Sequence, residues 1–253
     1  MSDLFWYQYF LIALIFVWSG FVRSGLGFGG AVLALPFLLL VVNDALIFLP
    51  LIAAHLMVFS LLITWRGRRA GVEAQSTIDW PYLGHAMKIM IVPKLIGVFG
   101  LLTLPPRVMT TIIFLIVIGY AIGYVLNKPI RSTHPKVDVV LLMLGGYVSG
   151  SSLIGAPLIV AVFASHVARH QLRDTLFVLW FILVTIKMAS FVIAGVDLQL
   201  IHHLWLLPCA WLGHILGERF HRRLVTAETP LFFRVVGTVL LVVSVIGIFW
   251  PPA

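Results

Sequence analysis

Basic residues inside apolar runs are the groups in this sequence most able to do chemistry. Lys94 lies near the middle of the apolar run 81–103, and Lys187 lies deep in the run 174–194. Arg23 ends an apolar run close to the start of the chain. Ionisable side chains at membrane depth are costly and usually functional. The 9 acidic residues all lie in loops or near the ends of runs, so these cations need another negative partner, and a bound anion would supply it.

Two glycine- and serine-rich segments, 23–30 and 145–157, interrupt the apolar runs. A helix that restarts after such a break presents free N–H groups and the positive end of its dipole, which bind oxyanions readily. Serine hydroxyls add donors, and glycine lets the backbone come close to a ligand. We expect the two tips and the two lysines to form one central anion site. The residues predicted to bind the substrate are Arg23, Ser24, Gly25, Gly27, Gly29, Gly30, Lys94, Ser149, Gly150, Ser151, Ser152, Gly155 and Lys187.

Each of these residues also has a plainer interpretation. Either lysine would extend its ammonium group to the membrane surface if its helix were tilted or shifted. Arg23 would be an ordinary loop residue if the first glycine-rich hairpin crossed the membrane twice. The serine hydroxyls could bond only to carbonyl groups within their own helices.

Two histidines within apolar runs, His55 and His214, are candidates for coupling transport to protons, because histidine titrates near physiological pH. Packing or interhelical hydrogen bonding is the alternative role for both. The single cysteine, Cys209, excludes a multi-cysteine metal site, and the apolar runs lack the carboxylates that hard metal cations prefer. We therefore expect no metal site and no cofactor.

The elements that must position these residues are membrane-spanning helices. The 253 residues are 61% hydrophobic and 10% charged, with a mean hydropathy of +1.10, whereas a soluble domain carries about 25% charged residues. So few polar groups cannot coat a water-facing surface. We interpret the net charge of +8 as the positive-inside bias of membrane proteins and not as a nucleic-acid-binding surface. The expected partners are the lipid bilayer and a small anion.

The apolar runs suggest an all-α polytopic membrane protein built from two repeats. The two glycine-rich segments look like copies, since Ser24 and the glycine after it precede Ser149 and the glycine after it by 125 residues. We interpret 1–128 as a first transmembrane repeat and 129–253 as a second, each with a broken-helix hairpin followed by three transmembrane helices. The ten runs are 4–22, 27–42, 45–65, 81–103, 108–126, 138–150, 153–167, 174–194, 200–217 and 231–250.

The distribution of basic residues predicts how the chain is oriented. Short basic loops should be cytoplasmic, and four stand out at 66–69, 128–136, 169–173 and 219–223. Counting crossings from these loops places both termini outside and gives each repeat an odd number of crossings. The second repeat is then inverted, as in many secondary transporters. The glycine-rich hairpins are either re-entrant or two short crossings, and an ordinary bundle whose glycines only allow close packing is the alternative.

The chain carries the stretches SGLGFGGAVLALPFLLL, SGSSLIGAPLIVAVF and HQLRDTLFVLWF. Together they resemble the duplicated pattern of the TauE/SafE family of anion exporters, in which each half opens with a glycine-rich broken helix. Here Gly155 begins a Gly-Ala-Pro sequence at the place of the family's Gly-Pro-Pro-like element, and Arg173 stands where the family has an arginine. The chain reads AAHL at 53–56 where the family often has a Thr-Ser pair. The resemblance implies export of sulfite, sulfonates or related small organic anions.

The expected function is therefore secondary transport of a small anion across the cytoplasmic (inner) membrane, and not enzymatic catalysis. A potential that is negative inside favours export, by about 2.3 kcal/mol per charge per 100 mV, and the sequence has no GxxxxGK[ST] nucleotide loop. One alternative is an intramembrane serine hydrolase, which would need Ser149 and His214 in contact. The other is a divalent metal cation transporter, which would want carboxylate ligands.

Overall fold

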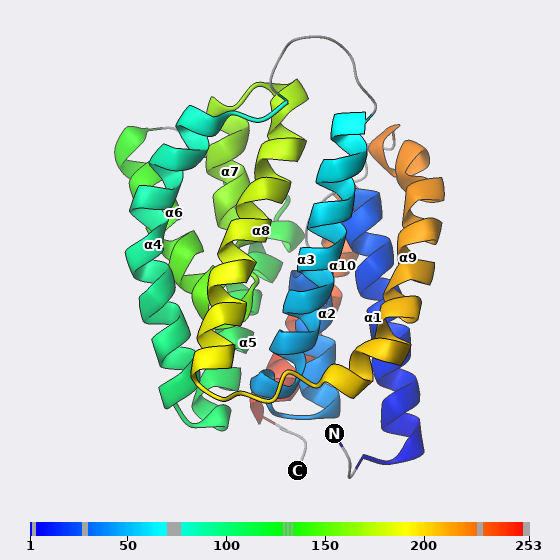
Figure 1. Cartoon of the computed structure of the whole chain (residues 1–253). Helices are drawn as coiled ribbons and strands as arrows, with labels where there is room; N and C mark the ends of the chain where they lie inside the picture. Colours follow the sequence, from blue (N-terminus) through cyan, green and yellow to red (C-terminus); the bar gives the residue numbers. More distant parts are fainter. Residues whose placement is uncertain are drawn as a thin grey trace. The chain divides into compact units, whose positions relative to one another are not determined.

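The computed structural model describes residues 1, 4–26, 30–69, 77–128, 130, 132, 134–226 and 230–249. Over these residues the chain forms α-helices and no strand (Figure 1). The helices are α1 (Trp6–Leu26), α2 (Gly30–Val41), α3 (Ala45–Arg69), α4 (Trp80–Thr103), α5 (Pro106–Val125), α6 (Pro135–Ser152), α7 (Ala156–His166), α8 (Arg169–Ile193), α9 (Leu200–Thr226) and α10 (Pro230–Phe249).

Each predicted apolar run became one helix, and the differences are confined to the helix ends. The helix α9 continues to Thr226, beyond the run 200–217, and α6 continues to Ser152, beyond the run 138–150. An apolar run shows only where the side chains suit lipid or a protein core. A helix ends where its backbone hydrogen bonding ends, and basic or serine side chains do not interrupt that bonding, so a helix can continue beyond its apolar run.

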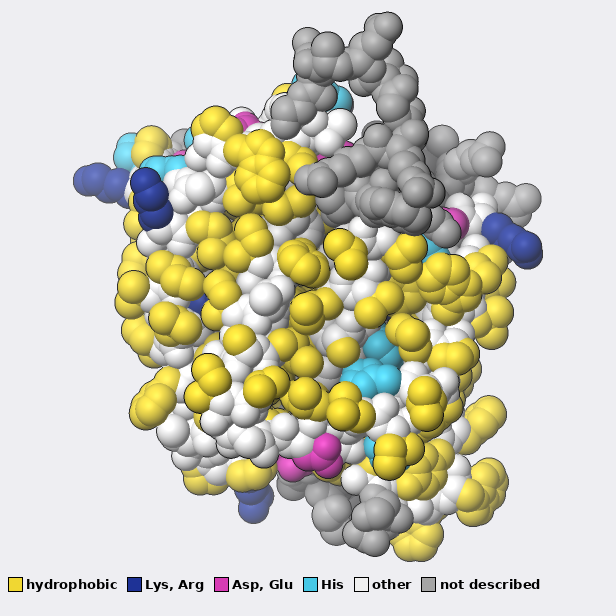
Figure 2. Space-filling model, viewed as in Figure 1, with side chains coloured by type: hydrophobic (Ala, Val, Ile, Leu, Met, Phe, Trp, Pro, Cys, Tyr) yellow, Lys and Arg dark blue, Asp and Glu magenta, His cyan; other side chains and the backbone are white. Residues whose placement is uncertain are grey.

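Among the described residues, six helices are long and apolar enough to cross a membrane: α1, α3, α4, α5, α8 and α9. The shorter apolar helices are α2, α7 and the part of α10 from Arg234 to Phe249. Large apolar side chains such as Phe99, Ile193 and Leu204 are exposed, and hydrophobic side chains dominate the face drawn in Figure 2. Such a surface suits lipid, because the backbone polar groups beneath it are satisfied within the helices.

The helices group into two compact units, which are described separately. Unit 1 comprises Met1–Leu51, Leu104–Pro129 and Asp197–Ala253. Within it α1 packs along α9, α5 packs along α10, and α1 and α2 form a hairpin (Figure 1). A Cβ on Gly20 would overlap the Ala210 carbonyl, and one on Gly213 would overlap the Val17 carbonyl. Glycine thus lets the backbones of α1 and α9 touch, which is how small residues drive helix association in membranes.

Unit 2 comprises Ile52–Thr103 and Ile130–Val196. Within it α4 packs along α6, α6 and α7 form a hairpin, and α8 packs against both α4 and α7. Glycines again bring two helices together, because a Cβ on Gly97 of α4 would overlap the carbonyl of Tyr147 on α6. Residues of α4, α7 and α8, among them Met90, Phe163 and Leu183, form the apolar core of this unit.

Both units combine helices from the two predicted repeats. In unit 1 the first helix of the first repeat, α1, pairs with the fourth helix of the second, α9. In unit 2 the first helix of the second repeat, α6, pairs with the fourth helix of the first, α4. The border between 1–128 and 129–253 is therefore not a border between compact units, and the two repeats stay a prediction.

The link between α6 and α7 is a tight turn. Leu153 follows α6 in the left-handed conformation, with φ of 61°, and donates its N–H to the Ser149 carbonyl at 3.3 Å. Left-handed residues commonly end helices, although glycine is the usual choice. A Cβ on Gly155 would overlap the carbonyl of Gly145, so α6 and α7 lie backbone against backbone at the start of the hairpin. Whether this hairpin is re-entrant stays a prediction.

The other end of this hairpin is held by polar contacts. Asp138, in the first turn of α6, accepts hydrogen bonds from Ser132 and, at 2.8 Å, from Nε2 of His166 at the end of α7. Burial alone would raise the pKa of the Asp138 carboxyl. Hydrogen bonds from Ser132 and His166, together with the charges of His166 and His134, outweigh burial and hold that pKa below its ordinary value of 3.8.

A carboxyl whose pKa is lowered by folding stabilises the fold above the unfolded-state pKa, and this contribution is lost as the pH falls through the folded-state pKa. We therefore expect Asp138→Asn to lower the free energy of unfolding at neutral pH by about 1 kcal/mol or less, because His166 is 40% exposed and the pair is screened. Unfolding curves of both proteins should converge below about pH 3. A difference that persists there would show that the carboxylate charge is not the cause.

Candidate functional site

Lys94 reaches α6 from α4. Its side chain is 0% exposed, and its Nζ donates to the hydroxyl oxygen of Ser149 at 3.2 Å. The two helices are in backbone contact at this level, since a Cβ on Gly150 would overlap the carbonyl of Lys94. The ammonium therefore lies between two helices, and the alternative that it extends to the membrane surface does not fit its burial.

Lys187 reaches the same turn of α6 from α8. It is also 0% exposed, and its Nζ donates to the carbonyl oxygen of Gly150 at 2.7 Å. The carbonyls of the last helical turn lack partners within the helix and carry partial negative charge, so they attract a cation. The ammonium also lies 5.6 Å from the centre of the Phe191 ring, where the face of the ring adds a weak attraction.

These two cations are only partly satisfied by the protein. Within the described part of the chain each ammonium makes one hydrogen bond and neither pairs with a carboxylate. Lysine has three N–H donors, so two remain on each. Buried charge without a partner is expensive, and two positive charges beside one helix turn increase that cost. An anion bound there would supply both the countercharge and the missing acceptors.

The serines of this tip differ in what their hydroxyls can do. The oxygen of Ser149 accepts from Lys94, so its own hydrogen is directed elsewhere and can be donated. Ser151 and Ser152 both donate to the carbonyl oxygen of Val148, at 3.3 and 3.0 Å. This matches the alternative interpretation, in which these serine hydroxyls bond to carbonyl groups of their own helix. They lie in the last turn of α6, and α7 restarts only at Ala156, with Gly155 as its N-cap. Ser149 is thus the hydroxyl best placed to donate to a ligand.

The first tip lies in unit 1 and is also buried. Arg23 and Ser24, in the last turns of α1, are 6% and 7% exposed. Gly30 begins α2, and its carbonyl accepts a hydrogen bond from the hydroxyl of Ser19 at 3.2 Å. The predicted site residue Gly25 lies within α1. Gly27 and Gly29, which are also predicted site residues, lie outside the described residues.

His214 of α9 contacts this tip. Its Nδ1 is hydrogen-bonded to the hydroxyl of Ser24, and its Nε2 lies 3.3 Å from a carboxylate oxygen of Glu218. The sequence suggested His214 as a titrating group but did not connect it with Ser24 or Glu218. The four-residue spacing from His214 to Glu218 was the available signal, because such residues are neighbours on a helix. The other candidate histidine, His55, is buried in α3, and its role stays a prediction.

The two tips have matching polar contacts. Ser24 and Ser149 were recognised as equivalent positions of the two glycine-rich segments, and each hydroxyl meets a basic nitrogen. For Ser149 that nitrogen belongs to Lys94 of α4, and for Ser24 it belongs to His214 of α9. The helices α4 and α9 occupy the same place in the order of the two predicted repeats. The tips lie in different units, and their union in one central site stays a prediction.

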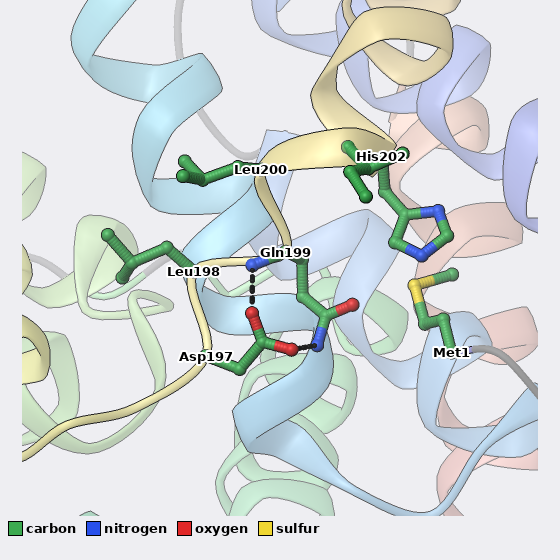
Figure 3. Close-up of a pocket in the computed structure, with 7 residues that line it drawn as sticks. Met1, Asp197, Leu198, Gln199, Leu200 and His202 are labelled. Carbon is green, nitrogen blue, oxygen red and sulfur yellow. Dashed lines mark hydrogen bonds between the residues drawn. The ribbon is translucent and has the colours of Figure 1, made fainter.

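A separate hollow of about 510 Å³ lies in unit 1 around the start of α9 (Figure 3). Met1 and residues 197–202 line it. Asp197 accepts hydrogen bonds from the backbone N–H and side-chain amide of Gln199, both at 2.8 Å, so its carboxylate is used locally. No three His, Cys, Asp or Glu side chains of the described chain come together as a metal-binding group.

Comparison with known families identifies the chain. The chain matches the family described as "Sulfite exporter TauE/SafE" over residues 11–246. No curated protein and no solved structure matches the chain. The family match extends over both glycine-rich tips and both buried lysines, and it agrees with the resemblance found in the sequence. This multi-pass membrane protein therefore belongs to the sulfite exporter TauE/SafE family.

Proposed function

We propose that this protein is a secondary transporter that moves a small anion outward across the cytoplasmic membrane. The description of the family points to sulfite, and we include sulfonates such as sulfoacetate among the proposed substrates. One observation carries the proposal: Lys94 and Lys187 are both fully buried beside the last turn of α6. Two buried cations with spare N–H donors and no carboxylate partner among the described residues fit an anion site and oppose a cation site.

Binding at this tip follows from the donors that are available. The two ammonium groups and the hydroxyl of Ser149 can donate to sulfite or sulfonate oxygens, and hydrogen bonds between charged groups are about twice as strong as neutral ones. Gly150 and Gly155 keep the helices close, so the donors converge on a small volume. The first tip, with Arg23, Ser24, Gly25, Gly27, Gly29 and Gly30, is proposed to complete the anion site.

Transport requires that the site open to each side of the membrane in turn. The proposed architecture is a pair of inverted repeats with both termini outside, which can alternate between two related arrangements. The pairing of a first helix with a fourth helix in both units supports this duplication. Export needs no nucleotide, because the membrane potential drives an anion out of a cell that is negative inside.

Electrogenic flux in proteoliposomes tests the proposal. Purified protein is challenged with sulfite, sulfoacetate, taurine-like sulfonates and short carboxylates, with and without a pH gradient. We expect saturable flux of at least one sulfur oxyanion, accompanied by movement of negative charge. Absence of anion flux from folded protein, together with thermal stabilisation by a divalent metal, would contradict the proposal and favour the metal-transport alternative.

A further inference from the structure

We propose that His214 makes anion binding at the first tip depend on a proton, by deciding whether the hydroxyl hydrogen of Ser24 is free to be donated. This inference rests on the proposed function, because it assumes that an anion binds at the tip. All three residues that carry it, Ser24, His214 and Glu218, lie in unit 1.

Two contacts of His214 bear on where the hydrogen of its neutral ring lies. Its Nε2 lies 3.3 Å from Glu218, and an ionised carboxylate can only accept a hydrogen bond. The hydrogen of the neutral ring therefore lies on Nε2, and Nδ1 is left as an acceptor. The hydroxyl of Ser24, hydrogen-bonded to Nδ1, must then be the donor. In this state the hydrogen of Ser24 is not available to an anion.

Protonation of His214 reverses this hydrogen bond. A proton taken from water adds to Nδ1, which becomes a donor to the oxygen of Ser24. The hydroxyl hydrogen of Ser24 rotates away from the ring and can be donated to a substrate oxygen. One proton is bound and no covalent bond other than the new N–H is made. The imidazolium also adds a positive charge near the anion, so proton binding and anion binding favour each other, as linkage requires.

The second tip contains a version of this contact that does not titrate in the same way. A charged lysine ammonium has only donors, so while Lys94 is protonated the oxygen of Ser149 accepts from it and the hydroxyl hydrogen is free. The two equivalent serines thus differ in one respect. Ser149 can donate to an anion while the ammonium of Lys94 is charged, whereas Ser24 can donate only when His214 carries a second proton.

The surroundings of His214 permit such a switch. Its side chain is 5% exposed, while that of Glu218, one turn further along α9, is 51% exposed. The helix that packs along α9 is α1. Its described titratable side chains are Arg23, next to Ser24, and Tyr7 and Tyr9 near the opposite end. The remaining described titratable side chains of α9 are His202, His203, Cys209 and Arg219.

Binding of sulfoacetate at two pH values tests the proposal, because both of its acid groups stay ionised between about pH 6 and pH 8. Calorimetry on the purified full chain should give a dissociation constant about tenfold lower at about pH 6 than at about pH 8, the effect of one hydrogen bond to a charged group. His214→Lys should bind with the tighter value at both pH values, because lysine is a permanent donor. Ser24→Ala should bind more weakly than the wild-type protein at about pH 6 and should show a ratio well below tenfold, because only the charge of the imidazolium then responds to pH.

His85→Gln is the matched control, since it removes an exposed histidine of α4 and should keep the tenfold ratio. If the wild-type protein binds sulfoacetate equally at both pH values, or if the full tenfold ratio survives in either His214→Lys or Ser24→Ala, the switch is wrong and the anion site stands. If sulfoacetate binds at neither pH, the proposed function fails and the switch fails with it. Should His214→Lys not fold, Ser24→Ala alone decides between these outcomes.

Discussion

Anion flux is expected to be lost, by a factor of about 100 or more, when either Lys94 or Lys187 is replaced by methionine. Each substitution removes one positive charge and three N–H donors from the turn of α6 that carries Ser149 and Gly150. Each lost hydrogen bond to a charged group costs about 1.5–3 kcal/mol, and the lost charge adds to this. Flux of sulfite or sulfoacetate into proteoliposomes measures the effect.

The fold should survive these two substitutions. Methionine resembles the apolar stem of lysine, and exchanging a poorly paired buried charge for an apolar group is often neutral or stabilising. Thermal unfolding in detergent should therefore show equal or higher stability. Lys88→Met is the matched control, because Lys88 is an exposed lysine of the same helix α4 and its loss should leave flux unchanged. Normal flux in both buried-lysine variants would rule out this anion site.

Replacement of Gly97 by alanine is expected to destabilise the protein by about 3 kcal/mol. The new Cβ would overlap the carbonyl oxygen of Tyr147 and lie 2.9 Å from the backbone nitrogen of Ser151. Neither backbone atom can move aside alone, so α4 and α6 must separate along their length. Van der Waals packing between small residues is a main force between membrane helices, and the separation would forfeit it. Loss of monodisperse protein on size exclusion and a lowered unfolding temperature would report this.

Gly84→Ala provides the comparison on the same helix. Nothing lies within 4 Å of the Cβ that it would add, so only helix propensity changes, which favours alanine by about 1 kcal/mol. We expect this variant to be as stable as the wild-type protein or slightly more so. If Gly97→Ala behaves like Gly84→Ala, α4 and α6 are not in backbone contact at that position.

The sequence by itself determined the membrane class, the number of helices and the positions of the breaks. A bilayer requires a run of apolar side chains for each buried helix, and each helix satisfies its own backbone groups. Both requirements are local in sequence, so the runs predicted every helix from α1 to α10 to within about five residues at each end, apart from the C-terminal end of α9. Lys94 and Lys187 could be recognised for the same reason, because a charge inside an apolar run is visible without knowledge of its neighbours.

The family could also be recognised from short local patterns. The glycine-rich segments around Ser24 and Ser149 resembled one another and a known family, and the family match across 11–246 confirmed the resemblance. The particular anion, the direction of transport and the use of a proton are not local properties. They depend on how donors from separate helices are arranged in space.

Only the tertiary structure decided which side chains meet. Ser24 and His214 are 190 residues apart, and nothing in either segment indicates the other. The partner of Lys187 is the backbone carbonyl of Gly150, which has no side-chain signature at all. In water, apolar faces would reveal which side of a helix is buried, but in lipid both sides of a helix are apolar. Helix pairing then depends on the close fit of small residues such as Gly97 and Gly213, and that fit exists only once two helices are placed side by side.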